Sequence, residues 1–206
     1  MALIHRATLV PSKSELVDAW LPGRPWAPPG PVASGVSYRL DDPAGEVGME
    51  GFLLTDADGH TVHVPLTYRA QPLAGAQEHL LGTMEHSVLG TRWTYDGAHD
   101  PVFVATLVAT IATGGSEADE LVDVDGDLRP REPKVRLRGS GRPSEDLPAT
   151  GSLDVHEHDD RTVVSCVFGE LVLVRRVGTE PRCPASVAAT WDAHGSSALL
   201  AGLRLR

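Results

Sequence analysis

The sequence predicts an α+β fold made mainly of antiparallel β-strands, with a short N-terminal helix and one buried central helix. Three observations support this class. Apolar and polar residues alternate with a period of two through much of the first half and again near the C-terminus, which is typical of half-buried strands. Acidic and glycine-containing turns separate these stretches. Helix-capping signals occur at two places, each directly ahead of apolar residues.

The first helix is predicted after an initial strand over Ile4–Val10. Ser12 and Glu15 have the spacing of a capping box, in which each side chain accepts a hydrogen bond from the other residue's backbone N–H. We expect the helix to end near Leu21, because the segment 21–31 is rich in proline and can neither continue a helix nor pair as a central strand.

A hairpin is predicted in the middle of the first half. Two strand candidates, Glu46–Thr55 and His60–Ala70, flank the tetrapeptide Asp56-Ala-Asp-Gly59. A glycine at the end of such a turn accepts a positive φ angle, which tight hairpins require. Further antiparallel strands on either side would make a meander.

The central helix is predicted to begin after Asp100. An aspartate caps the helix N-terminus well, and Pro101 suits the first helical position. The residues from Val102 to Ile111 are apolar on nearly every side, so this helix belongs in a core or between layers. Gly114 is expected to end it.

Three regions follow from these patterns, and we expect them to pack as one compact unit. The first spans residues 1–115. Residues 116–150 form an acidic to Pro/Gly-rich connecting loop region, interrupted by one strand at Lys134–Arg138. Residues 151–206 contribute further antiparallel strands.

Composition limits the classes of partner. The net charge of −10 opposes binding to nucleic acid or to an anionic membrane surface. No run approaches the roughly 18 apolar residues that a membrane helix needs. The N-terminus lacks the layout of a signal peptide, so we expect a cytoplasmic protein. The two cysteines, Cys166 and Cys183, do not suggest a disulfide framework.

The segment from Leu80 to Val102 holds the densest group of polar and aromatic residues and is the candidate ligand or docking surface. Its candidate residues are His86, Arg92, Trp93, Tyr95 and Asp96. His86 and Ser87, with Asp96 or Asp100, contain the parts of a nucleophilic triad, but no oxyanion-hole motif accompanies them. The structural interpretation is favoured, in which the aromatic side chains point onto a core and the aspartates cap turns.

His156 and His158 are the residues most suggestive of a metal site. They would share one face of a strand, and two imidazoles with a carboxylate could bind zinc. No third ligand follows from the spacing, so a polar hairpin tip is favoured and no metal is expected. The sequence also holds no phosphate-binding loop, dinucleotide-binding glycine motif or nucleophile elbow, and we expect no cofactor.

Several short stretches resemble a known family. They are Val64-Pro-Leu-Thr-Tyr-Arg69, Leu81-Gly-Thr83 with Glu85-His-Ser-Val-Leu-Gly90, Arg92-Trp-x-Tyr-Asp96 and Asp100-Pro-Val102. Together they resemble the N-terminal cap region of actinobacterial maltokinases and of trehalose synthase–maltokinase fusions. The opening Ile4-His-Arg-Ala-Thr-Leu9 and the stretch Asp41-Asp-Pro-Ala-Gly-Glu-Val-Gly48 are similar to free-standing homologues of this cap. The resemblance covers residues 1 to about 115.

The resemblance implies a curved antiparallel sheet with helices. In that family the cap precedes a kinase-like fold that phosphorylates maltose with ATP and feeds α-glucan synthesis. The catalytic machinery of that fold lies outside the cap, and its motifs do not occur in this sequence, so no catalytic residue is carried over and no autonomous kinase activity is expected.

The leading hypothesis is therefore a non-catalytic cap-like accessory or binding protein in glycogen, maltose or trehalose metabolism, acting through a partner kinase or enzyme. One alternative is a small-molecule binder for a sugar or nucleotide, with aromatic faces that suit sugars. A further alternative is an uncharacterised enzyme or metal-dependent hydrolase.

Overall fold

The computed structural model describes residues 2–5, 7–33, 35–124, 127–142, 150–191 and 195–206. This part of the chain forms two six-stranded antiparallel sheets, a three-stranded sheet, two α-helices and three short 3-10 helices. The fold is α+β with strands predominating, which confirms the predicted class. In the described part, no helix has the length and apolar character needed to cross a membrane.

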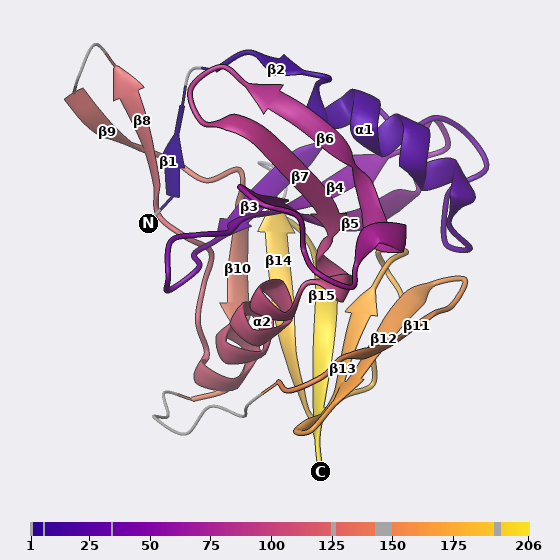
Figure 1. Ribbon diagram of the computed structural model, residues 1–206. Coiled ribbons are helices and arrows are strands. Elements are labelled where there is room, and N and C mark those ends of the chain that lie inside the picture. The colour runs from indigo at the N-terminus through magenta and orange to yellow at the C-terminus, as the bar shows by residue number, and fades with distance from the viewer. Residues whose placement is uncertain (1, 6, 34, 125–126, 143–149, 192–194) are drawn as a thin grey trace.

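The first large sheet, called the upper sheet, is curled and lies at the top of Figure 1. The strands run in the order β2 (Leu9–Val10), β6 (Leu80–His86), β7 (Gly90–Asp96), β5 (Thr61–Arg69), β4 (Gly48–Thr55) and β3 (Val36–Leu40). The hairpin β4–β5 turns at the predicted acidic tetrapeptide, with Gly59 at a φ of 86°. This prediction is confirmed.

The second large sheet, called the lower sheet, is built from the C-terminal part of the chain (Figure 1). The strands run in the order β10 (Val135–Gly139), β14 (Ala185–Trp191), β15 (Ser196–Leu205), β13 (Gly169–Val174), β12 (Arg161–Cys166) and β11 (Asp154–Glu157). Every neighbouring pair is antiparallel, as expected for residues 151–206.

The third sheet differs from the sequence-based expectation. It joins β1 (Ala2–Ile4), β8 (Glu120–Val124) and β9 (Asp127–Arg131), and β1 runs parallel to β8. The expected strand Ile4–Val10 is thus two strands in different sheets. The region 116–150 was expected to be a loop with one strand, but its described residues include three strands, because β8 and β9 pair with each other before β10. All five residues of β9 are exposed, so no apolar alternation marks this strand in the sequence.

Helix α1 (Lys13–Trp20) starts at the predicted capping box. The Ser12 hydroxyl accepts a hydrogen bond from the Glu15 N–H at 3.2 Å, and the Glu15 carboxylate accepts one from the Ser12 N–H at 2.7 Å. The helix passes into the 3-10 helix Leu21–Gly23. Leu16 and Val17 are buried, and Val17 and Leu21 join a core with Trp26 and residues of β5 on one face of the upper sheet.

Helix α2 (Pro101–Thr113) lies between the two large sheets (Figure 1). The Asp100 carboxylate accepts a hydrogen bond from the Val102 N–H at 3.0 Å, and Gly114 ends the helix in the left-handed conformation. Both capping predictions are confirmed. Buried side chains of this helix join the main core, which also includes residues of both large sheets. The chain passes from β7 to α2 through the 3-10 helix Gly97–His99, and the 3-10 helix Gln77–His79 precedes β6.

Close backbone contact seats α2 against the lower sheet. A Cβ atom on Gly139, the last residue of β10, would lie 2.0 Å from the carbonyl oxygen of Thr110. A Cβ atom on Gly141 would lie 1.9 Å from the carbonyl oxygen of Ala112. The Gly141 N–H instead donates a hydrogen bond to the carbonyl of Ile111 at 2.9 Å. Glycine at these two positions therefore lets backbone groups near the helix end pair with the chain after β10.

A buried ion pair joins the upper and lower sheets. Arg175, directly after β13, is fully buried and its guanidinium donates a hydrogen bond to the carboxylate of Asp96 at the end of β7. It also donates to the Thr162 hydroxyl at 2.8 Å and lies 4.4 Å from the centre of the Trp26 ring. One side chain thus connects both sheets and the loop that follows α1.

His63 on β5 forms a second buried polar contact between the sheets. Its ring nitrogens lie 2.8 Å from the Tyr38 hydroxyl and 3.1 Å from the carbonyl oxygen of Val174. Burial is the largest cause that lowers the pKa of His63, with the nearby Arg175 charge acting in the same direction, to about 3. The imidazole is therefore neutral in the folded protein at ordinary pH. Burial likewise lowers the pKa of His99 to about 4.

Replacing Arg175 by leucine is expected to destabilise the protein by about 3–5 kcal/mol, because Asp96 would keep a buried charge without its partner. Urea unfolding followed by circular dichroism measures this loss. The neighbouring exposed Arg176 is the matched control, since Arg176→Leu should change stability by less than about 1 kcal/mol. Equal losses in the two variants would contradict the role assigned to Arg175.

Stability is also expected to fall as the pH drops from about 6.5 towards 3. Below about pH 6.5 the unfolded chain gains a proton at His63 that the folded protein does not bind, so unfolding becomes more favourable, by up to about 1.4 kcal/mol per pH unit for this residue. Unfolding free energies at about pH 7 and pH 5 would show a smaller decrease in His63→Gln than in the wild type. His60→Gln is the control on the same hairpin, and an unchanged pH dependence in His63→Gln would disprove the assignment.

Candidate functional site

A cleft of about 450 Å³ opens beside the N-terminal end of α1 and across the strands of the upper sheet. Its lining comes from both ends of this sheet, from the loop between β3 and β4, and from Ile4, His5 and Ala7 near the N-terminus. Its charged and aromatic lining residues are His5, Lys13, Arg39, Asp41, Asp42, Glu46, Tyr68, His86 and Arg92.

A buried carboxylate underlies the cleft. Glu50 on β4 is only 5% exposed, and its carboxylate accepts hydrogen bonds from Lys13, from the Ser37 hydroxyl at 2.9 Å and from the Tyr68 hydroxyl at 3.2 Å. Arg39 lies 3.6 Å from the same carboxylate, an ion-pair distance. The negative charge of Glu50 is therefore matched by one close ammonium group, with a second cation beside it.

The pKa values in this network follow from burial and pairing. Burial lowers the pKa of the Lys13 ammonium, and Glu50 offsets part of this effect. Burial acts to raise the pKa of Glu50, but Lys13 and Arg39 outweigh it, so the pKa lies below its usual value. Burial together with the adjacent Glu50 raises the pKa of Tyr68 well above its ordinary value. Tyr68 is thus a neutral hydrogen-bond donor.

Two guanidinium groups line the cleft with donors to spare. Arg92 on β7 donates one hydrogen bond, from Nη2 to the carbonyl oxygen of Leu89 at 2.7 Å. Its Nε atom is buried and has no hydrogen-bond partner among the described residues. Arg39 on β3 reaches Glu50 only at the ion-pair distance given above. Since a guanidinium offers five N–H donors, this side of the cleft is rich in donors.

His86 shapes the rim of the cleft. Its Nδ1 accepts hydrogen bonds from the N–H groups of Val88 and Leu89, at 3.2 and 3.1 Å, and so holds the turn between β6 and β7. The ring also packs edge-on against His5, with centroids 5.7 Å apart. Burial lowers the pKa of His86, with smaller contributions from nearby positive groups.

The structure separates the five candidate residues predicted from the sequence. His86 and Arg92 line the cleft, whereas Trp93, Tyr95 and Asp96 are not part of its lining. Tyr95 is buried, and its hydroxyl accepts a hydrogen bond from the Leu73 N–H at 3.0 Å. The Asp96 carboxylate binds Arg175 and accepts a hydrogen bond from the Ala98 N–H at 3.2 Å.

The parts of the possible triad have separate structural partners. The Ser87 hydroxyl accepts a hydrogen bond from the Thr8 N–H at 3.0 Å, and the Nδ1 of His86 is occupied by its own turn. Asp100 caps α2 and forms a two-pronged ion pair with Arg69 at 2.6 and 2.7 Å. His99 stacks on His79 with ring centroids 3.5 Å apart. These contacts account for each side chain without a reaction.

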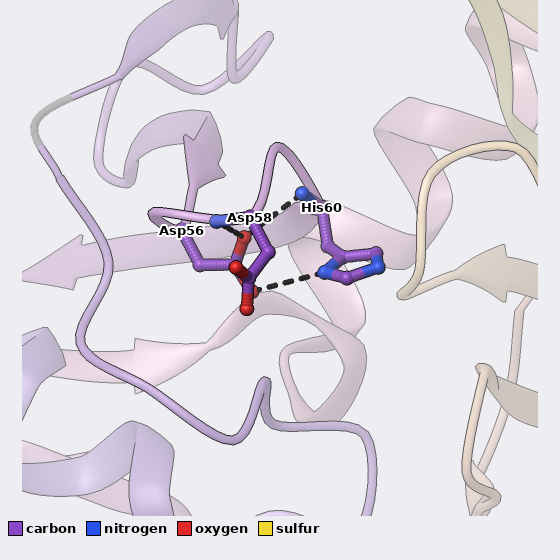
Figure 2. Close-up of side chains that lie close together, drawn as sticks. All are labelled: Asp56, Asp58 and His60. Atoms are coloured by element: carbon purple, nitrogen blue, oxygen red, sulfur yellow. Dashed lines mark hydrogen bonds and ion pairs between the residues drawn. The ribbon is translucent and has the colours of Figure 1, made fainter.

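Three potential metal ligands meet at the β4–β5 turn, as Figure 2 shows: Asp56, Asp58 and His60. The buried Asp56 carboxylate accepts hydrogen bonds from the N–H groups of Asp58 and His60, both at 2.9 Å. Its second oxygen lies 3.2 Å from the His60 Nδ1. This pattern is that of a self-capped turn, because Asp56 already satisfies the backbone of its own hairpin.

His156 and His158 do not assemble a metal site with a third donor in the part of the chain that the structure describes. The Nε2 of His156 lies 3.2 Å from the carboxylate of Asp154. The intervening Glu157 accepts a hydrogen bond from the Trp26 indole N–H at 3.0 Å and pairs with Arg24 at 3.5 Å. The charged tip of this hairpin therefore fastens the loop after α1 to the lower sheet.

The analysis of the sequence missed four residues of the cleft and of the network beside it, namely Lys13, Arg39, Glu50 and Tyr68. A signal was present at Glu50, where a carboxylate interrupts the largely apolar run of β4. A charge in such a position is rarely buried unless it is paired. The partners could not be identified, because they come from α1, β3 and β5.

Comparison with known families gives one match. Residues 20–100 match the family model of the maltokinase N-terminal cap domain. This range contains β3–β7, which are five of the six strands of the upper sheet, the cleft residues Arg39, Tyr68, His86 and Arg92, and the buried Glu50. A comparison with curated proteins found no match. Residues 20–100 are therefore similar to the maltokinase N-terminal cap domain, which supports the family resemblance seen in the sequence.

Proposed function

We propose that this protein is a non-catalytic cap-like accessory protein that acts with a kinase-type partner in maltose, trehalose or α-glucan metabolism. The observation that carries the proposal is the family match over residues 20–100, because a maltokinase cap accompanies a kinase part. Within the described residues, the parts of the possible triad serve turns, caps and ion pairs, which also favours a binding role.

The fold limits which surface of the upper sheet is open to a partner. One face packs on α2 and the lower sheet in the main core, and Arg175 fixes this arrangement. The turn between β6 and β7 points away from that core and exposes Val88 (57%) and Leu89 (44%). Val10 on the neighbouring edge strand β2 is 63% exposed. Apolar side chains grouped in this way are typical of an interaction site, so we assign the partner contact to this rim.

Small-molecule binding is the second candidate function, and the cleft is the observation in its favour. Its volume of about 450 Å³ falls within the range of small-ligand sites, and apolar residues alternate with a few charged groups along its wall. A sugar or a nucleotide would be a ligand of suitable size.

The partner proposal predicts that the purified chain binds a maltokinase from which the N-terminal cap has been deleted. Val88→Lys should weaken this binding by about 10-fold or more, because it places a charge in an apolar contact. The side chain of Val88 is exposed and its N–H bond to His86 involves the backbone, so the fold should be retained. Surface plasmon resonance with the immobilised kinase measures both affinities.

Val167→Lys is the matched control, since Val167 is 63% exposed, close to the 57% of Val88, but lies on the turn between β12 and β13 in the lower sheet. The affinity of the Val167→Lys variant for the capless kinase should equal that of the wild type. Failure of the wild type to bind the capless kinase would disprove the partner proposal. An equal loss of affinity in both variants would show that the partner contact is not located at the turn between β6 and β7.

A further inference from the structure

The cleft has more hydrogen-bond donors than the protein itself uses. The Nε of Arg92 is buried without a partner among the described residues, and Arg39 contacts Glu50 only at 3.6 Å. A buried guanidinium N–H without an acceptor costs free energy, so such a group is a natural place for a ligand to supply one. A carboxylate or phosphate group fits the planar fork of arginine best.

Two of the carboxylates at the cleft, Glu50 and Asp42, have other hydrogen-bond donors. Glu50 is matched by Lys13, Ser37 and Tyr68. Asp42 accepts hydrogen bonds from three backbone N–H groups in its own loop, those of Ala44, Glu46 and Val47, at 2.9–3.0 Å. Asp42 therefore structures the loop and does not reach across to the arginines.

The same loop sets a limit on the charge of a ligand. Asp41, Asp42 and Glu46 all line the cleft and make one wall acidic. A ligand with several negative groups would be repelled by this wall, whereas hydroxyl groups could donate hydrogen bonds to it. The charge distribution thus favours one anionic group joined to a neutral, hydroxyl-bearing body.

We propose that the cleft binds a small hydroxylated metabolite through a single oxyanion group, held by the guanidinium groups of Arg39 and Arg92. Lys13 stays paired with Glu50 and supplies positive potential from below. The neutral His86 and the loop 41–47 enclose the body of the ligand. This inference does not rest on the kinase partner: Val88, whose substitution tests the partner contact, does not line the cleft, although its neighbour Leu89 does.

The test uses the full chain and a matched series of small probes: glycerol 3-phosphate, glycerate and glycerol. Nuclear magnetic resonance of the arginine Nε–H groups should show a saturable shift of the Arg92 signal with one or both anions and none with glycerol. We expect dissociation constants in the millimolar range for such small probes. A response to glycerol 3-phosphate alone would identify a phosphate ligand, and a response to glycerate alone a carboxylate ligand.

Substitutions then locate the site. Arg39→Gln and Arg92→Gln should each weaken binding of the responding anion by about 10-fold to 100-fold, the range expected for one charge-assisted hydrogen bond. Arg129→Gln is the control, because Arg129 is exposed on β9 and lies outside the cleft. Thermal melting checks that each variant is folded, and Arg92→Gln leaves the Glu50 network intact. The proposal is overturned by equal binding of glycerol, by no response to either anion, or by unchanged affinity in both cleft variants.

Discussion

The architecture depends on the buried contact between Arg175 and Asp96. The two residues are 79 positions apart in the chain: Asp96 ends β7 in the upper sheet, and Arg175 directly follows β13 in the lower sheet. A buried charge is tolerated only when a partner and further hydrogen bonds compensate for lost hydration. Asp96, Thr162 and the face of Trp26 supply this compensation together, so the guanidinium is accommodated only when both sheets and the loop after α1 are in place. This dependence ties the family-matched segment to the C-terminal strands.

Glu50 is a second buried charge that needs compensation, and its partners lie at a cleft. Its carboxylate is as deeply buried as many core side chains, but its partners lie along the wall of a cleft and are not sealed between two sheets. Lys13 comes from α1, Arg39 from β3 and Tyr68 from β5, so the network also orients the helix on the upper sheet. Lys13, Arg39 and Tyr68 also line the cleft, together with the acidic residues Asp41, Asp42 and Glu46. Structural stability and ligand recognition can therefore draw on the same residues.

Local signals in the sequence predicted local structure well. The capping box at Ser12, the N-cap at Asp100 and the hairpin that turns at Gly59 depend on residues near one another, and all three are found in the structure. The strand β9 escaped detection because it is fully exposed and is stabilised only by pairing with β8. The candidate site was only partly identified. His86 and Arg92 lie in a conspicuous segment of the sequence, but the partners of Glu50 come from three distant elements. Sequence spacing contains no information about such convergence.

The strand β7 shows how one conspicuous segment serves two purposes. Successive side chains of a strand point to opposite faces, so Arg92 and Asp96 share one face while Trp93 and Tyr95 share the other. Four residues of strand separate Arg92 from Asp96 by about 13 Å. At one end the Asp96 carboxylate binds the buried Arg175, and at the other Arg92 lines the cleft. A rigid strand anchored at its sealed end holds the open end in position, which is what a binding site needs for its polar groups. The buried ion pair therefore stabilises the fold and also fixes the geometry of the cleft.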